Sequence, residues 1–324
     1  MKKLFTAFIF ILVMSAIAGC SGETEKGKKP MKVGIMLSDV GLGDQSFSDA
    51  GFAGLEKARD ELGILFDYKE LSETKSYENG LRQLAKEGND IVIGLGFMVQ
   101  EPMEKVAKEF PKQKFLLIDS QSKLENVYTI NFKEEQGSYL VGYLAAMKSS
   151  TDTIGFIGGM DVPLIRKFAA GFLEGAKAAD PNTKVIIQYA GDFGKPEIGA
   201  KLAADMIDQG ADYLYPAAGL TGLGVLNTAQ EKQVYSFGVD SDQYFLAEKS
   251  VVSSMVKKID HSIYSSIQDL QKGKLTKRAE LGLKENGVGM ADIRIISLSE
   301  EEKSKLEEMK KSIESGKINV PTDY

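Results

Sequence analysis

From residue 31 onward, short apolar runs alternate with longer stretches in which apolar residues recur every three or four positions. The short runs are rich in Val, Ile, Leu and Phe, which is typical of strands covered on both faces. They occupy Lys32–Leu37, Leu65–Leu71, Ile91–Leu95, Lys114–Ile118, Val127–Asn131, Thr153–Ile157, Val185–Tyr189, Tyr213–Tyr215 and Val234–Val239.

The stretches between these runs have the spacing of helices that bury one face. Their apolar stripes include Phe52 and Leu55, Met103 and Val106, Tyr139 and Tyr143, Phe168 and Phe172, Ile198 and Leu202, and Ile259 and Ile263. Towards the C-terminus, Ser299 followed by Glu302 predicts a capping box that opens a charged helix ending at Gly316. This β-α alternation predicts an α/β fold of parallel sheets with helices on both faces.

The predicted strands are too many for one comfortable sheet, so we expect two doubly wound parallel-sheet domains joined by a hinge. The chain is expected to cross to the second domain near Asn131–Gln136 and to return near Lys249–Met255. We therefore assign residues 31–131 and about 252–283 to an N-terminal lobe. Residues 132–251 and about 284–324 form the expected C-terminal lobe.

The first residues have the pattern of an export signal. Lys2 and Lys3 precede an apolar run that is short for a membrane span, and small residues follow it up to Cys20. The Ala18-Gly19-Cys20 sequence resembles the bacterial lipobox, in which cleavage exposes a cysteine that is then lipid-modified. We predict a signal peptide over residues 1–19, a lipidated Cys20 and a flexible tether over residues 20–30, which places the protein at the extracytoplasmic face of the cell membrane.

Composition narrows the chemistry further. The 324 residues include one Cys, one His and no Trp, and the net charge is -6. This inventory disfavours disulfides, thiolate metal sites and His-rich zinc sites, and the absence of a basic surplus disfavours nucleic-acid binding. His261 lies off the apolar stripe of its predicted helix, so we expect it to face solvent.

The candidate chemistry lies in loops that follow the predicted strands, where open α/β sheets bind their ligands. The first loop runs from Ser38 to Ser48 and contains Asp39 and Phe47, while Asp119 and Asp240 end two later strands. Carboxylates there suit hydrogen bonds to ligand hydroxyls, a metal site or a pair of catalytic groups, and ordinary loop acids have the same pattern.

A glycine-rich turn spans Gly219 to Gly224 and lacks the Lys that a phosphate-binding loop would add. We interpret it as close backbone approach to a neutral ligand or to a neighbouring helix. No dinucleotide fingerprint, nucleophile elbow or zinc-protease motif is present in the sequence.

These loops together resemble the basic membrane protein family of substrate-binding lipoproteins, whose best-understood members are purine nucleoside receptors of ABC importers. The resemblance covers residues 32 to about 298 and is carried by several ordered motifs. They include Ser38-Asp39, Asp44-Gln45-Ser46-Phe47, Gly94-Leu95-Gly96-Phe97, Gly158-Gly159-Met160, Gly191-Asp192-Phe193, Ala218-Gly219-Leu220-Thr221-Gly222, Gly238-Val239-Asp240-Ser241-Asp242-Gln243 and Ser254-Met255-Val256-Lys257.

The resemblance implies a type I periplasmic-binding-protein fold that closes around a nucleoside. It implies that Phe47 and Phe193 sandwich a purine and that Asp39 bonds the base. It further implies that Asp240 and Lys257 hold the ribose, with Asp119 in the polar set and Gly219 and Gly222 close to the ligand. Many relatives have Asn where this chain has Ser48, so the contact with the base edge is expected to differ.

We therefore expect a monomeric, lipid-anchored binding protein without cofactor, metal or catalytic activity. Its expected partners are a nucleoside and an ABC permease. Alternatives are a sensor of the same fold, a binding protein for another solute such as a sugar, and a nucleoside hydrolase built on the carboxylates.

Overall fold

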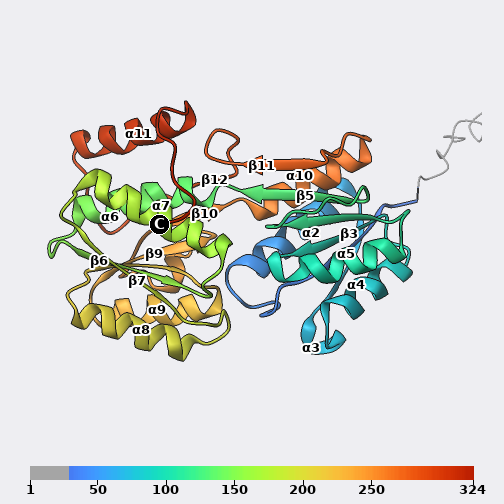
Figure 1. The fold of residues 1–324 in the computed structure, drawn as a ribbon, viewed down its shortest axis with the longest axis horizontal. Coiled ribbons are helices and arrows are strands. Elements are labelled where there is room, and N and C mark those ends of the chain that lie inside the picture. Colours follow the sequence, from blue (N-terminus) through green and yellow to red (C-terminus); the bar gives the residue numbers. More distant parts are fainter. Residues whose placement is uncertain (1–28) are drawn as a thin grey trace, which may run out of the picture. The chain divides into compact units, whose positions relative to one another are not determined.

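Two six-stranded sheets with helices on both faces make up the computed structural model, which describes residues 29–324 (Figure 1). The predicted signal peptide, Cys20 and most of the predicted tether lie outside the described residues. None of the helices within residues 29–324 has the length and apolar character needed to cross a membrane.

The first sheet has the strand order β11-β5-β4-β3-β1-β2, and all its neighbouring strands are parallel. Its strands are β1 (Lys32–Met36), β2 (Leu65–Lys69), β3 (Ile91–Leu95), β4 (Lys114–Ile118), β5 (Val127–Phe132) and β11 (Arg278–Leu281). Helices α2 (Phe47–Leu62) and α10 (Ile259–Gln271) pack on one face, and α4 (Tyr77–Lys86) and α5 (Gln100–Glu109) on the other. The short α3 (Leu71–Thr74) and η1 (Phe97–Val99) lie in its loops.

The second sheet has the order β12-β10-β9-β8-β6-β7, in which only β12 is antiparallel to its neighbour. Its strands are β6 (Thr153–Gly158), β7 (Lys184–Tyr189), β8 (Tyr213–Ala217), β9 (Tyr235–Asp240), β10 (Val251–Lys257) and β12 (Val288–Met290). Helices α6 (Glu134–Lys148) and α7 (Pro163–Ala179) cover one face, and α8 (Pro196–Asp208) and α9 (Leu220–Glu231) cover the other. The remaining elements are η2 (Tyr244–Leu246) and α11 (Glu300–Glu314), which packs on α6.

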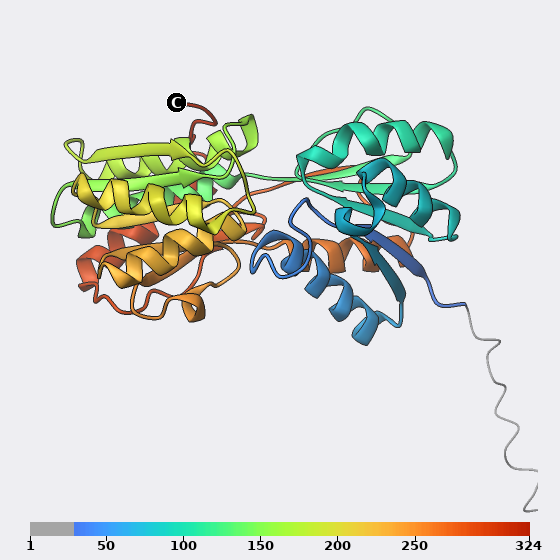
Figure 2. The ribbon, with the colours of Figure 1, turned by 90° about the horizontal axis from the view of Figure 1, so that it is seen from below.

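The predicted fold class, two doubly wound parallel-sheet domains, is confirmed. The chain passes between the two sheets after β5, after β10 and after β11 (Figure 2). The second of these crossings differs from the expected position, because β10 pairs with β9 and its residues Val251–Lys257 therefore belong to the second sheet. The return to the first sheet follows Lys257 instead of falling near residue 252.

Candidate functional site

Loops at the carboxyl ends of strands in both sheets border a cavity whose empty volume, including its mouth, is about 660 Å³. The lining contains nearly all of the site residues predicted from the sequence, namely Asp39, Phe47, Asp119, Phe193, Gly219, Asp240 and Lys257. The predicted residues at the strand ends therefore lie together around this cavity.

Gly222 is the exception among the predicted site residues. It lies inside α9, where an added Cβ would meet the Pro216 side chain at 3.3 Å, and it does not line the cavity. Gly224 in the same turn packs against the backbone of Pro196 at the start of α8. Only Gly219 reaches the cavity, at a φ of 54° that favours glycine. The glycine-rich turn therefore serves mainly helix packing.

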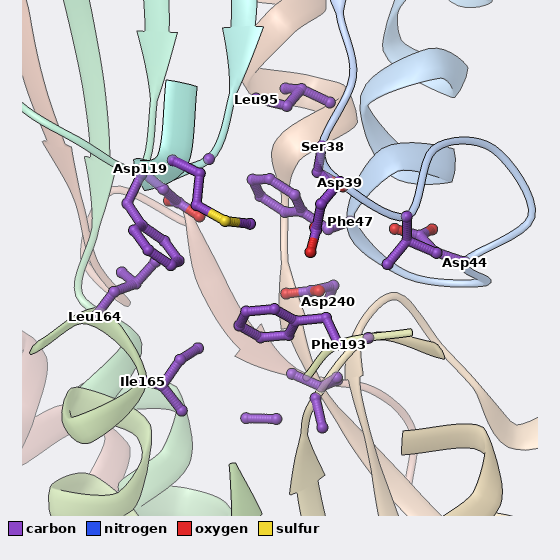
Figure 3. A pocket seen from close by; sticks show the side chains of 18 of the residues that line it. Ser38, Asp39, Asp44, Phe47, Leu95, Asp119, Leu164, Ile165, Phe193 and Asp240 are labelled. Carbon is purple, nitrogen blue, oxygen red and sulfur yellow. The ribbon is translucent and has the colours of Figure 1, made fainter. Parts of the chain in front are cut away.

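Four phenylalanines line the cavity, and the two that were predicted from the sequence, Phe47 and Phe193, come from different lobes. Phe47 begins α2, and Phe193 lies in the loop between β7 and α8 (Figure 3). Each ring packs against a glycine at a strand end: a Cβ on Gly96 would lie 3.4 Å from the Phe47 ring, and one on Gly159 would lie 2.3 Å from the Phe193 ring. A side chain at Gly159 would displace the Phe193 ring, whereas a Cβ on Gly96 would only make van der Waals contact with the Phe47 ring.

Asp44 shapes the loop that carries Phe47. Its buried carboxylate accepts hydrogen bonds from the backbone N–H groups of Ser46, Ser48 and Asp49 at 2.9, 2.7 and 3.2 Å. It thereby satisfies the free amides at the start of α2. Burial raises the pKa of Asp44 to about 6, although these hydrogen bonds act in the opposite direction.

Because Asp44 caps the helix, the Ser46 side chain is free to bond elsewhere. Its Oγ donates to Asp240 Oδ2 at 2.6 Å, which joins the first-lobe loop to the end of β9. Beside it, Gln243 Nε2 donates to the Gln45 carbonyl oxygen at 2.8 Å. We call these two hydrogen bonds the interlobe latch.

The polar end of the cavity is a buried ion cluster. Lys257, at the end of β10, pairs with Asp119 Oδ2, and its Nζ lies 3.2 Å from Glu134 Oε1. The other oxygen of Glu134 lies 3.2 Å from Lys167 Nζ. Lys257 Nζ also lies 5.1 Å from the centre of the Phe47 ring, a cation-π distance. Charged and aromatic residues thus meet at one end of the cavity.

On the side that faces the cavity, this cluster has two carboxylates, Asp119 and Asp240, and one ammonium group, that of Lys257. Burial lowers the pKa of Lys257, but Asp119, Glu134 and Asp240 together raise it more, so the ammonium stays charged. Burial raises the pKa of Asp119 and of Asp240, and Lys257 only partly offsets this. Asp119 Oδ1 has no hydrogen-bond partner among the described residues. The cluster is therefore short of donors, a deficit that ligand hydroxyl groups can meet.

Asp119 and Asp240 occupy equivalent places in the two lobes. Asp119 follows β4, and Asp240 ends β9. Each of these strands is the third from one edge of its sheet, counted from β11 in the first sheet and from β12 in the second. Both residues have a φ of 64°, in the left-handed region that is uncommon outside glycine. Such backbone strain is typical of functional sites.

Sequence reasoning missed several residues that build this site. Glu134 is fully buried and holds Lys257, but a glutamate at a helix start reads as an ordinary first-turn acid. Thr221 accepts from Lys195 N and donates to the Asp192 carbonyl, both at 2.8 Å, and thereby fixes the loop of Phe193. Met98, Leu164, Ile165 and Phe168 form an apolar wall that no motif indicated.

The arrangement offers binding groups and no evident catalytic set. His261 is exposed on α10, as expected, and lies outside the cavity lining. Within residues 29–324, no group of three or more His, Cys, Asp or Glu residues has the geometry to hold a metal ion. Two lobes enclosing a cavity lined in this way define the class of bilobal substrate-binding proteins.

The chain belongs to the Bmp family, since the family model described as "ABC transporter substrate-binding protein PnrA-like" matches residues 31–323. It is 31% identical to the ABC transporter nucleoside-binding protein BmpA of Lactococcus lactis, over 99% of this chain and 100% of that protein. It is 35% identical to an uncharacterized lipoprotein of Pyrococcus abyssi, over 90% of this chain and 78% of the relative.

Among solved structures, a solute-binding protein of an ABC transporter system from Aeropyrum pernix superposes with a TM-score of 0.83 at 27% identity, covering 91% of this chain and 95% of that one. The fold is therefore that of the type I periplasmic binding proteins. The chain is a substrate-binding protein of ABC transport and not an enzyme, with a small-molecule ligand and a transporter permease as partners.

Proposed function

We propose that this protein captures purine nucleosides at the extracytoplasmic face of the membrane for an ABC importer. The observation that carries this proposal is the pairing of two phenylalanines from opposite lobes with a buried carboxylate-lysine cluster in one cavity. A flat base gains about 1–3 kcal/mol per stacking contact, and a ribose supplies hydroxyl donors to carboxylates. The name of the Lactococcus relative agrees with this ligand class.

In this proposal each cavity residue has a role that its chemistry supports. Phe47 and Phe193 stack on the two faces of the purine, and Asp39 bonds the base. Asp119, Asp240 and Lys257 hold the ribose, and the backbone of Gly219 borders the ligand. The two lobes, with residues 31–132 and about 258–283 in the first, then close around the nucleoside by a hinge motion at the crossing segments.

A thermal-shift panel tests the ligand class. Guanosine, inosine, adenosine, cytidine, ribose and an amino acid are added separately to the purified full-length protein, and ligands that bind the folded state raise the melting temperature. We expect a shift with purine nucleosides and none with ribose alone. If a sugar or an amino acid shifts the temperature while every nucleoside is silent, the proposal is wrong.

Asp240→Ala tests the site. We expect Asp240→Ala to abolish the nucleoside-dependent shift in melting temperature. The melting temperature without ligand should remain close to that of the wild-type protein. The matched control is Asp205→Ala, because Asp205 is exposed on α8. Unchanged nucleoside binding by the Asp240 variant would refute the ribose assignment.

The membrane anchor is part of the same proposal and rests on the sequence around Cys20 and on relatives named as lipoproteins. Two or three acyl chains provide stable attachment where one is marginal. We expect Cys20→Ser to block incorporation of labelled palmitate and to release the protein from the membrane fraction. Continued labelling of that variant would place the modification elsewhere.

A further inference from the structure

Two of the large apolar side chains that residues 29–324 expose to solvent lie on the loops that form the interlobe latch. Leu42 is 36% exposed and lies three residues before Gln45, in the loop after β1. Phe245 is 73% exposed, the largest fraction among the large apolar residues of this part of the chain, and lies in η2, two residues after Gln243. Neither side chain lines the cavity. Each lobe thus presents an apolar side chain beside the latch.

Hydrogen bonds fix the loop that displays Leu42. The N–H group of Leu42 donates to Glu70 Oε1 at 2.8 Å, and that of Gly43 donates to Asp49 Oδ1 at 2.8 Å. Gly41 and Gly43 have φ values of 76° and 89°, which glycine adopts readily. The loop projects from the first lobe toward the second (Figure 2). Because the loop is already ordered, it would lose little freedom when a partner covers Leu42.

A stack of side chains supports Phe245 in the second lobe. Arg294 donates to both carboxylate oxygens of Asp242, at 3.1 and 2.8 Å, and its guanidinium lies 4.7 Å from the centre of the Tyr244 ring. The Tyr244 ring packs edge to face against Phe245, with ring centres 5.2 Å apart. The Phe245 ring at the end of this stack is therefore held in place while most of its surface stays in water. Aromatic side chains of this kind are enriched in protein interfaces.

The interlobe latch joins the two loops that display these side chains. Its hydrogen bonds run from the first loop to Asp240 and Gln243, which precede η2 in the second lobe. Because Leu42 and Phe245 belong to different lobes, any opening of the lobes changes the distance between them. A rigid partner that contacts both side chains can therefore do so in only one arrangement of the lobes.

The charges beside the two side chains favour a protein partner over a membrane surface. The carboxylates of Asp49 and Glu70 bind backbone next to Leu42, and an anionic lipid surface repels such groups. On the second lobe, the charge of Asp242 is balanced by Arg294. The class of the protein supplies a partner that is itself a protein, the permease of the transporter.

We propose that Leu42 and Phe245 form one docking surface, in which an apolar extracytoplasmic segment of the permease covers both side chains when the interlobe latch is formed. The permease thereby distinguishes the closed protein from the open one, because only the closed protein presents the two side chains at the spacing that the latch fixes. This docking surface follows from the class of the protein and does not depend on the identity of its ligand.

Photocrosslinking tests where the permease binds. Benzoylphenylalanine replaces Leu42 or Phe245 in the full-length protein, in host cells that lack the wild-type copy, and the adducts formed on illumination are identified by mass spectrometry. We expect adducts with the membrane-spanning subunit of an ABC transporter from both positions. Leu65 is the matched control, because it is 52% exposed at the start of β2, the end of the sheet away from the cavity, and should give no such adduct.

Three results would overturn the docking surface. The first is that either position fails to give the permease adduct. The second is that both positions give adducts with lipid alone, which would assign the two side chains to the membrane surface. The third is that Leu65 gives the permease adduct in equal yield.

Leu42→Ser and Phe245→Ser separate docking from ligand binding. We expect isothermal titration to give a guanosine affinity within about twofold of the wild-type value, as for other surface substitutions. Uptake of labelled guanosine by the host cells should fall by roughly tenfold or more, as when a central residue of an interface is removed. Leu65→Ser should keep both affinity and uptake.

The outcomes distinguish this proposal from the proposed function. Wild-type uptake with either variant, or a loss of guanosine affinity as large as the loss of uptake, would show that Leu42 and Phe245 are not a docking surface. If the wild-type protein binds no nucleoside, the proposed function is wrong, and the crosslinks still decide whether the permease covers these two side chains.

Discussion

At the scale of single residues, the site depends on acids held in unusual environments. Asp44 and Glu134 position residues of the cavity lining: Asp44 caps α2, and Glu134 forms an ion pair with Lys257. Glu135, the neighbour of Glu134, is also buried, and its Oε2 has no hydrogen-bond partner among the described residues. Sequence patterns cannot distinguish these acids from solvated ones, because their role follows from burial.

Glu135 gives a prediction about stability and pH. Burial raises its pKa to about 7, with a further contribution from Glu134. A carboxyl group whose pKa is higher in the folded state stabilises the fold at pH values below its unfolded pKa of 4.5, and this stabilisation is lost as pH rises through about 7. Glu135→Gln removes this dependence.

We therefore compare the free energy of unfolding of Glu135→Gln with that of the wild-type protein. The difference should move in favour of the variant by roughly 2–3 kcal/mol between about pH 4.5 and pH 8, since one pKa unit is about 1.4 kcal/mol. Urea unfolding at several pH values measures this difference. Glu231→Gln, at an exposed position, serves as the control and should show no such trend. A flat difference for Glu135→Gln would show that its carboxyl titrates normally.

At the scale of elements, glycines allow helices to pack in close pairs. A Cβ on Gly171 or Gly175 of α7 would lie 2.1 or 1.9 Å from a carbonyl oxygen of α6, and one on Gly142 of α6 would lie 2.0 Å from a carbonyl of α7. Gly199 and Gly224 make the corresponding contacts between α8 and α9. The helix pairs that flank the second sheet thus approach backbone to backbone.

Gly175→Ala tests this packing. Alanine favours a helix by about 1 kcal/mol over glycine, but overpacking of a close contact costs typically 1–3 kcal/mol, and here the contact is with backbone that cannot move aside easily. We expect a net loss of stability, measured as a lower urea midpoint. Gly289→Ala is the control, because a Cβ there meets nothing within 4 Å. Equal midpoints for the two variants would contradict the account.

Most strands and most helices could be predicted from the sequence, because buried parallel strands leave continuous apolar runs. The sequence analysis did not predict β11 and β12, because Arg278–Leu281 and Val288–Met290 are too short to show a periodic pattern. β10 was not predicted because Ser253 and Ser254 interrupt its apolar run, although both residues are buried. α9 was not predicted because its glycines were interpreted as a turn, whereas they allow the helix to pack closely against α8.

The candidate site was predictable where a strand end and a loop coincide, as at Asp119 and Asp240. Its tertiary partners were not, since Ser46 meets Asp240 and Lys257 meets Asp119 only after the chain has crossed between the sheets. Such contacts join residues far apart in the sequence and leave no local pattern. The sequence likewise could not show that Gly222 faces protein and not the cavity.

At the scale of the whole molecule, the two lobes are linked both by the crossing segments and by the interlobe latch. Ser46 Oγ uses an oxygen of Asp240, the same carboxylate that we assign to the ribose. Closure and ligand contact are therefore coupled through one side chain. Binding proteins of this class control ligand release through the stability of the closed form.

Ser46→Ala should weaken the latch without touching the cap of α2, which Asp44 provides. A hydrogen bond to a charged group contributes about 1.5–3 kcal/mol, so we expect nucleoside dissociation to accelerate by roughly tenfold or more. Stopped-flow displacement measures this rate. Ser150→Ala, at an exposed site in the second lobe, is the control. An unchanged dissociation rate would mean that the latch does not hold the closed form.

The position of a purine nucleoside in the protein is the most direct test of the proposed function, and a crystal structure of the guanosine complex measures it. We predict the base between Phe47 and Phe193, the ribose hydroxyls within hydrogen-bond distance of Asp240 and the Lys257–Asp119 pair, and the amide edge of the base at Asp39. Guanosine bound outside this cavity, or bound within it with the base away from both rings, would contradict the account.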